Sequence, residues 1–124
     1  MSNKVLIVDD EEAFQLLMAT SLQRSGYQPL TASNAIQAIA IIRQSRPDAI
    51  ILDDMMPGMS GADFCATLKK DPALRNIPVI LYTSGVRYAL DELRERSGAD
   101  AALRKTGKMQ DLLAVLKQLL IAAV

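Results

Sequence analysis

Apolar residues along the chain follow two patterns that alternate. Short unbroken apolar runs, such as those in Lys4–Val8 and Ile50–Leu52, are typical of strands buried on both faces of a sheet. Between such runs, apolar residues recur at the three- and four-residue spacing of a helix. One stripe of this kind consists of Ala35, Ala38, Ile39 and Ile42. The alternation occurs five times and predicts five strands, each followed by a helix.

The boundaries of these elements follow from turn and cap residues. The predicted strands are Lys4–Val8, Gln28–Ala32, Ile50–Leu52, Ile77–Tyr82 and Ala101–Leu103. The predicted helices are residues 13–24, a second between Ser33 and Pro47, a third between Ser60 and Asp71, a fourth from Gly85 to Gly98, and a last one with Leu112, Val115, Leu116 and Leu119 on one face. Ser33 and Ser60 are expected to cap their helices, and Pro29 places its strand at a sheet edge. Right-handed crossovers then give a doubly wound α/β sandwich with a parallel five-stranded sheet.

Composition narrows the classes of protein. Half of the 124 residues are apolar, enough for the core of one domain over residues 1–124. The 14 basic and 14 acidic residues cancel, so net charge favours neither nucleic acid nor a membrane as a partner. The chain has no His, which excludes a Ser-His-Asp triad and imidazole zinc sites, and the lone Cys65 excludes an internal disulfide. Without a leader-like opening, the chain is expected in the cytoplasm, and its apolar end is too short to span a bilayer.

Polar and charged side chains follow the predicted strands where each one ends. They are Asp9, Asp10, Asp53, Thr83 and Lys105. The carboxyl ends of parallel strands meet at one edge of a sheet, where ligands bind in this architecture. Three carboxylates and one ammonium leave two negative charges in an oxygen-rich site, which favours a hard divalent ion and Mg²⁺ above others. A carboxylate beside such an ion, a lysine and a hydroxyl has the groups that phosphoryl transfer requires.

Each of these residues also has an ordinary structural explanation. Asp9 and Asp10 could cap the first helix, Thr83 could be a turn hydroxyl, and Lys105 could be a solvated charge. Their concurrence at one rim favours a site instead. Asp54 should point away from the rim by strand alternation and is interpreted as a surface acid. Cys65 lies on the apolar stripe of its helix and is interpreted as a small buried hydrophobe.

The pattern resembles the receiver domain of two-component response regulators, of the chemotaxis-regulator type, over essentially the whole chain. The residues that carry the resemblance are Leu-Ile-Val-Asp-Asp at 6–10, Ile-Leu-Asp-Asp-Met-Met-Pro-Gly-Met-Ser-Gly at 51–61, Pro-Val-Ile-Leu-Tyr-Thr-Ser at 78–84, and Lys105 after Gly98-Ala99-Asp100. The resemblance implies a flavodoxin-like fold with strand order 2-1-3-4-5. It also implies that Asp53 accepts a phosphoryl group, with Thr83 and Lys105 holding that group. The implied Mg²⁺ ligands are Asp10, Asp53 and the backbone carbonyl of Met55, with Asp9 acting through water.

The resemblance carries further expectations about partners. A sensor histidine kinase or phosphotransfer protein would supply the phosphoryl group, and the domain would catalyse only its own phosphorylation and dephosphorylation. It would signal through its fourth and fifth helices and fifth strand. Neither direct nucleic-acid binding nor membrane binding is expected. The cognate kinase, the controlled output and the length of the whole protein are not determined by these residues.

Three positions depart from the family pattern. Thr106 and Gly107 follow Lys105 where the family has a proline after a cis bond, and a cis bond before a non-proline costs about 3 kcal/mol, so a trans Lys105–Thr106 bond is predicted. Ala102 occupies the position of the family's aromatic switch residue, which predicts a shallow coupling to the output face. Tyr88 is considered as a substitute ring, against the alternative of an exposed helix tyrosine.

Two alternatives of other classes are weaker. A flavodoxin-like flavin binder needs a phosphate loop after the first strand, and the sequence Asp-Glu-Glu-Ala at 10–13 would repel a phosphate. A haloacid-type phosphatase needs a second Asp where Met55 stands. A pseudo-receiver, which is an interaction module of the same fold with little phosphate turnover, stays open because of Ala102 and Thr106.

The last helix predicts association. Leu120, Ile121 and Val124 extend its apolar surface beyond the stripe that the core requires. One interpretation is a frayed helix end or the start of a linker. The other is a self-complementary face, formed with the fourth helix and fifth strand, through which two copies pair as a homodimer.

Overall fold

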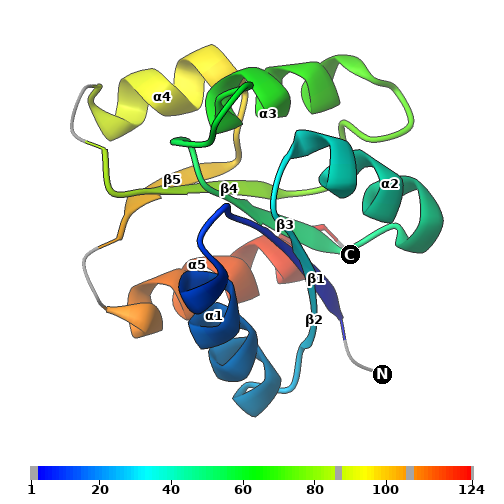
Figure 1. Cartoon of the computed structure of the whole chain (residues 1–124), viewed down its shortest axis with the longest axis vertical. Helices are drawn as coiled ribbons and strands as arrows, with labels where there is room; N and C mark the ends of the chain where they lie inside the picture. Colours follow the sequence, from blue (N-terminus) through cyan, green and yellow to red (C-terminus); the bar gives the residue numbers. More distant parts are fainter. Residues whose placement is uncertain (1–2, 86–87, 106–107, 124) are drawn as a thin grey trace.

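The strands form one parallel sheet whose order confirms the prediction. The computed structural model describes residues 3–85, 88–105 and 108–123, and within them the sheet runs β2-β1-β3-β4-β5 (Figure 1). The strands are β1 (Lys4–Val8), β2 (Gln28–Ala32), β3 (Ala49–Leu52), β4 (Val79–Thr83) and β5 (Ala101–Arg104). The helices are α1 (Glu12–Arg24), α2 (Ala35–Ser45), α3 (Gly61–Lys70), α4 (Leu90–Ser97) and α5 (Met109–Ala122). The fold is therefore the predicted flavodoxin-like α/β sandwich, with β2 and its Pro29 at an edge.

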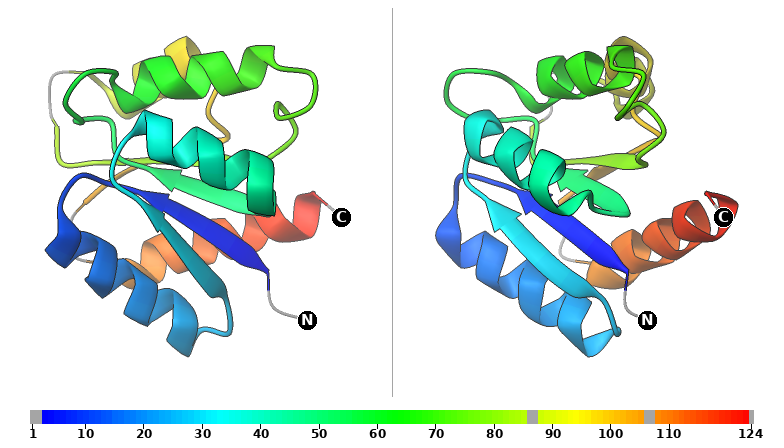
Figure 2. Two further views of the ribbon diagram at one scale, coloured as in Figure 1. Left: turned by 45° about the vertical axis from the view of Figure 1, so that its right-hand side comes forward. Right: turned by 90° about the vertical axis from the view of Figure 1, so that its right-hand side faces the viewer.

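Helices cover both faces of the sheet, which explains the unbroken apolar strands. α2, α3 and α4 lie on one side and α1 and α5 on the other (Figures 1 and 2). Alternate strand residues feed two separate cores: Leu6 and Leu52 pack under the α2-α3-α4 layer, whereas Ile7 and Ile51 pack against α1 and α5. A strand that is buried on both faces cannot alternate with polar residues.

Hydrogen bonds between neighbouring strands align the strand ends, and the acidic residues follow directly after these ends. Val8 pairs with Leu52 across β1 and β3, and the Asp53 amide donates to the Val8 carbonyl at 2.9 Å. The Lys105 amide likewise donates to the Thr83 carbonyl at 2.9 Å. The end of each strand is thus tied to its neighbour, and the polar residues that follow come out at one rim.

Most boundaries of helices and strands agree with the prediction to within one residue. Three details differ: the residue that caps α2, the start of the fourth helix and the start of the fourth strand. The side chain of Asn34, not Ser33, caps α2 by accepting from the Gln37 amide at 2.9 Å. Ser60 caps α3 as predicted, with the Asp63 amide 3.1 Å from its hydroxyl. The fourth helix begins at Leu90 and not at Gly85. The fourth strand begins at Val79, two residues after the predicted start.

Two apolar residues are placed differently from the prediction. Leu17 falls at helical spacing with Met18 and Leu22, which predicts a place on the apolar face of the first helix, but it is 56% exposed because Gln15, Met18 and Leu22 form the buried face. Leu120 was counted as surplus surface but is buried in the α1-α5 core. Ile121 is exposed as predicted, and Val124 lies outside the described residues. None of the described helices is long and apolar enough to cross a membrane.

Candidate functional site

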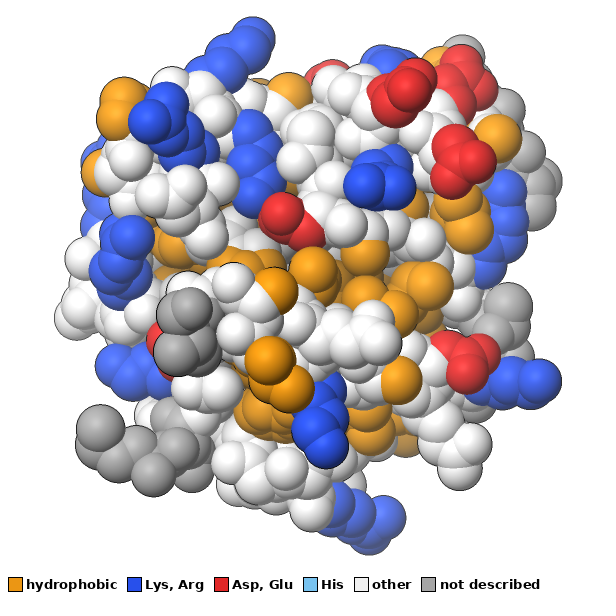
Figure 3. All heavy atoms as spheres, turned by 180° about the vertical axis from the view of Figure 1, so that it is seen from behind, with side chains coloured by type: hydrophobic (Ala, Val, Ile, Leu, Met, Phe, Trp, Pro, Cys, Tyr) orange, Lys and Arg blue, Asp and Glu red, His pale blue; other side chains and the backbone are white. Residues whose placement is uncertain are grey.

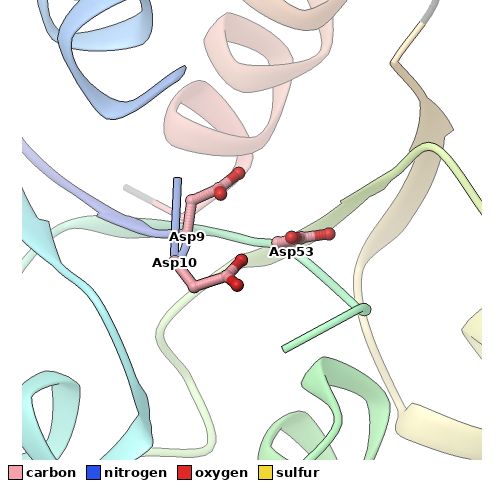
Figure 4. A group of neighbouring side chains, drawn as sticks. All are labelled: Asp9, Asp10 and Asp53. Carbon is pink, nitrogen blue, oxygen red and sulfur yellow. The ribbon is translucent and has the colours of Figure 1, made fainter. Parts of the chain in front are cut away.

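Three carboxylates from two neighbouring strands meet at the sheet's carboxyl rim (Figure 4). Asp9 and Asp10 follow β1, Asp53 follows β3, and one oxygen of each lies within 4.8 Å of the others. Asp9 and Asp53 are buried and Asp10 is exposed, so the cluster opens to solvent on the Asp10 side. Carboxylates this close repel one another unless a positive charge lies among them.

Lys105 supplies a positive charge to this cluster, and it follows β5, the strand at one edge of the sheet. Its ammonium lies 2.7 Å from Oδ2 of Asp9 and 3.6 Å from Oδ2 of Asp53, and its side chain is only 11% exposed. The other oxygen of Asp9 accepts from the Glu11 amide at 2.9 Å. Both oxygens of Asp9 therefore already have partners within the protein.

Thr83 completes the set of predicted site residues. It is fully buried at the end of β4, and its hydroxyl accepts from the Gly85 amide at 2.9 Å. A cleft of about 1030 Å³ opens beside it, lined on this side by Ser84, Gly85 and Met55 and reaching Asp10. Asp10 is the member of the acidic cluster that lines this cleft, so a ligand in the cleft would meet the cluster at Asp10.

The loop after β3 holds Asp53 in place. The Met55 amide donates to Oδ1 of Asp53 at 3.2 Å. Gly61, the first residue of α3, lies so close to β3 that a Cβ there would come 2.1 Å from the Asp53 carbonyl oxygen. Glycine is therefore required at this point for α3 to pack close to the backbone of Asp53.

Asp54 is half-buried and structural, which corrects its assignment as a surface acid. Its carboxylate accepts from the Ala62 amide at 2.8 Å, and its carbonyl accepts from the Gly61 amide at 3.0 Å. It is not among the clustered carboxylates, as predicted from strand alternation. Asp54 binds the free amides at the start of α3 and so anchors the loop that carries Asp53 and Met55.

Gln15 was missed by sequence reasoning. Its side-chain amide is buried and donates to the carbonyls of Asp9 and Ala32 and to the Ser33 hydroxyl. It thereby joins the ends of β1 and β2 beneath the acidic residues. The signal was present in the sequence, because a polar residue shares the buried face of α1 with Met18 and Leu22.

Tyr88 lies just before α4 and not on it, which corrects the alternative of an exposed helix tyrosine. It is half-buried against the same core as Ala102, and the Arg96 guanidinium lies 4.9 Å from the centre of its ring. Arg104 of β5 donates to the carbonyls of Gly85 and Tyr88. The segment between Thr83 and α4 is thus attached to β5. Thr106 and Gly107, with the predicted trans peptide bond, lie outside the described residues.

Burial raises the pKa of the Asp53 carboxyl from 3.8 to about 6, the Lys105 ammonium opposes this rise, and the Asp9 and Asp10 charges add to it. The charged form of Asp53 is thus held at a cost in free energy.

Cys65 differs from a reactive thiol. It is a buried residue of α3, and burial raises the pKa of its thiol to about 11. This confirms its interpretation as a small core residue.

The donor set fits a hard divalent cation. Within the described residues the cluster offers only carboxylate oxygens, and the chain contains no His. Oxygen ligands of this kind suit Mg²⁺, whereas zinc and copper sites use nitrogen or sulfur. Asp10 and Asp53 could hold such an ion, which would offset the repulsion among the carboxylates and favour the charged form of Asp53.

Comparison with known proteins assigns the family. The sequence profile of the response regulator receiver domain matches residues 5–117. The chain therefore belongs to the receiver domain family of two-component response regulators. The phosphate regulon transcriptional regulatory protein PhoB of Pseudomonas aeruginosa is 37% identical over 116 residues, which are 94% of this chain and 51% of PhoB. The response regulator PleD of Caulobacter vibrioides is 44% identical over 84 residues, which are 68% of this chain and 18% of PleD.

Solved structures agree with this assignment. The receiver domain of a signal transduction histidine kinase from Syntrophus aciditrophicus superposes with a TM-score of 0.90 at 34% identity, covering 98% of this chain and 92% of that one. Response regulator TrrA of Thermotoga maritima, in complex with Mg²⁺ and beryllium fluoride, gives a TM-score of 0.84 at 30% identity, covering 96% and 99%. The chain spans about half the length of PhoB and less than a fifth of PleD.

The raised pKa of Asp53 predicts how stability depends on pH. Between about pH 4 and pH 6 the folded protein binds a proton that the unfolded chain has lost, so stability falls as the pH rises through this window. Asp53→Asn removes the titrating group and should raise the free energy of unfolding at pH 7 by roughly 2 to 3 kcal/mol in metal-free buffer. Urea unfolding in chelator at several pH values measures this.

A matched control for this prediction is Asp54→Asn, which keeps an oxygen for the Ala62 amide and lies outside the cluster. It should leave the pH dependence as in the unaltered protein. Equal stability of Asp53→Asn and the unaltered protein at pH 7 would contradict a free-energy cost of holding the charged Asp53 carboxylate.

Proposed function

We propose that this receiver domain accepts a phosphoryl group on Asp53 from a sensor histidine kinase or phosphotransfer protein. The observation that carries the proposal is the convergence of Asp53, Lys105 and the clustered acids at one open rim. An oxygen of Asp53 would attack phosphorus while the bond to the donor's imidazole nitrogen breaks, and that nitrogen keeps the bonding electron pair. The reaction is the domain's own phosphorylation. Attack of water on the phosphorus of the aspartyl phosphate, which releases inorganic phosphate and restores the Asp53 carboxylate, is its own dephosphorylation.

Each neighbouring group would have a distinct role. A bound Mg²⁺ supplies positive charge that stabilises the equatorial oxygens of the transferring group. Asp10, Asp53 and the carbonyl of Met55 are proposed to hold it. Asp9, whose oxygens are occupied by Lys105 and the Glu11 amide, would contribute its charge and act through water. Lys105 would pair with one oxygen of the transferred group, and the Thr83 hydroxyl would donate to another.

A second candidate is a pseudo-receiver that turns over little or no phosphate. The small side chain of Ala102, half-buried under α4, is the observation that favours it, because no ring there can move when Thr83 moves. The intact set of Asp53, Thr83 and Lys105 supports the first candidate. A cytoplasmic location remains a prediction in either case.

Phosphoryl uptake separates the two candidates. Acetyl phosphate and Mg²⁺ should add the mass of one phosphoryl group to the unaltered protein and to Asp54→Asn, but not to Asp53→Asn, because Asp53 is the proposed acceptor beside Lys105, whereas Asp54 binds the Ala62 amide outside the cluster. Intact-protein mass spectrometry measures this, with chelator as the second control. A mass gain that persists in Asp53→Asn or in chelator refutes Asp53 as the metal-dependent acceptor, and no gain in any sample supports the pseudo-receiver.

We further propose that two copies pair through α4, β5 and α5. β5 is the edge strand on this side, and hydrophobic side chains form a band across the middle of this face (Figure 3). Leu113, Val115 and Leu119 of α5 are only partly buried, and Ile121 is 65% exposed. A two-fold axis would bring this band against its own copy.

Sedimentation over a range of protein concentrations tests the pairing. A dimer is expected, and beryllium fluoride with Mg²⁺ should change its dissociation constant by less than about fivefold, below the usual range of allosteric coupling, because Ala102 offers little to reshape. Ile121→Ser should weaken the dimer, whereas Ile36→Ser, on the exposed side of α2, is the matched control. A monomer in all conditions contradicts the pairing, and a large shift with beryllium fluoride contradicts the weak coupling.

A further inference from the structure

The ammonium of Lys105 has a third neighbour that is not charged. It lies 4.1 Å from the centre of the Phe14 ring, a distance at which a cation is attracted to the face of an aromatic ring. Phe14 belongs to α1, near its N-terminal end, and its ring packs against Tyr82 of β4 with a centroid distance of 6.0 Å. The ring is therefore held between helix and sheet, directly beside the site.

The charges around both ionic partners of Lys105 change when the site is used. The proposed cation would offset part of the Asp9 charge, and the proposed phosphoryl group would move the negative charge of Asp53 onto the phosphoryl oxygens. Each event changes the attraction that now holds the ammonium 2.7 Å from Asp9 and 3.6 Å from Asp53. The field of the Phe14 ring does not change in either event. It is the one contact in this set that stays constant through loading of the site.

The backbone gives a second reason for the ring to matter. The amide of Lys105 is fixed to the Thr83 carbonyl at 2.9 Å, but the flexible side chain beyond it has four rotatable bonds. Thr106 follows where a proline would fix the backbone angle φ. Since the lysine side chain is only 11% exposed, its attraction to the ring is little weakened by water.

We propose that Phe14 is a positioning residue for Lys105: its ring face holds the ammonium beside the Asp53 carboxylate while the charges around Asp9 and Asp53 change. Phe14 itself touches neither donor nor metal in this account. The proposal rests on the proposed function of the site, and it concerns the rate of phosphoryl uptake rather than the ability to bind a metal.

Three variants separate ring electrostatics from packing. Phe14→Leu keeps an apolar side chain but removes the ring, and Phe14→Tyr restores a ring. Phe64→Leu is the control, because Phe64 is the chain's other phenylalanine. It belongs to α3 and is buried in the core on the other face of the sheet. Phe14→Leu should take up phosphoryl groups from acetyl phosphate about tenfold more slowly, a factor within the range of a shielded cation–π contact. Phe14→Tyr should be close to the unaltered protein, and Phe64→Leu should lose stability without losing rate.

Nuclear magnetic resonance gives a readout that does not depend on phosphorylation. The ε-methylene protons of Lys105 should be shifted upfield by the Phe14 ring, and Phe14→Leu should move them to the position of the other lysines. The dissociation constant of Mg²⁺, measured from the rise in melting temperature, should change far less than the rate. A Mg²⁺ dissociation constant that rises by the same factor as the rate falls would indicate a general loss of structure and would overturn the positioning role.

The remaining outcomes are distinguishable. If the unaltered protein takes up phosphoryl groups and Phe14→Leu does so equally fast, the inference fails and the proposed function stands. If Phe14→Tyr is as slow as Phe14→Leu, packing and not the ring face is responsible, which also overturns it. If the unaltered protein takes up none, the proposed function fails, and an absent upfield shift would show separately that the ring does not hold the ammonium.

Discussion

The repulsion among three carboxylates at one sheet edge is the constraint on which the rest of the site depends. Asp9, Asp10 and Asp53 lie within 4.8 Å of one another at their oxygens, and Lys105 is the cation that reaches Asp9 and Asp53. A single ammonium leaves two negative charges uncompensated. The folded chain thus spends some of its stability on holding charges together, as functional sites commonly do. Burial is the largest cause of the raised pKa of Asp53, and the Asp9 and Asp10 charges add to the rise.

The fold supplies the restraints that keep this arrangement in place. Backbone hydrogen bonds fix Asp53 to Val8 and Lys105 to Thr83. The side chains of Asp9 and Lys105, which are 96 positions apart in the sequence, therefore meet. Asp54 anchors the loop that follows Asp53, and Gly61 lets α3 approach that loop closely. Gln15 anchors the end of β1 by donating a hydrogen bond to the Asp9 carbonyl. These neighbours carry no reactive group, yet each limits how far the acids can separate.

Much of this was predictable from the sequence, because the relevant signals are local or periodic. Strands buried on both faces must be continuously apolar, and parallel topology then places residues that follow strands at one rim. Asp9, Asp53, Thr83 and Lys105 could be found in this way. The errors arose where tertiary contacts decide: Asn34 and Ser33 are both good caps, and only the structure shows which one faces the Gln37 amide. Leu17 is exposed and Leu120 is buried, the reverse of the expectation, because packing sets the rotation of each helix about its own axis. The contact of Phe14 with Lys105 joins distant residues and has no sequence period.

The central claim is that the acidic cluster is a strained site completed by a divalent cation, and linkage of metal binding to folding tests it most directly. Thermal unfolding at pH 7 should be measured against Mg²⁺ concentration for the unaltered protein and for Asp10→Asn. At 10 to 100 times its dissociation constant, Mg²⁺ should stabilise the unaltered protein by about 1.4 to 2.7 kcal/mol. Asp10→Asn should start from a more stable metal-free state, since one repelling charge is gone, and should gain much less from Mg²⁺. A melting temperature indifferent to millimolar Mg²⁺ in the unaltered protein would contradict the account.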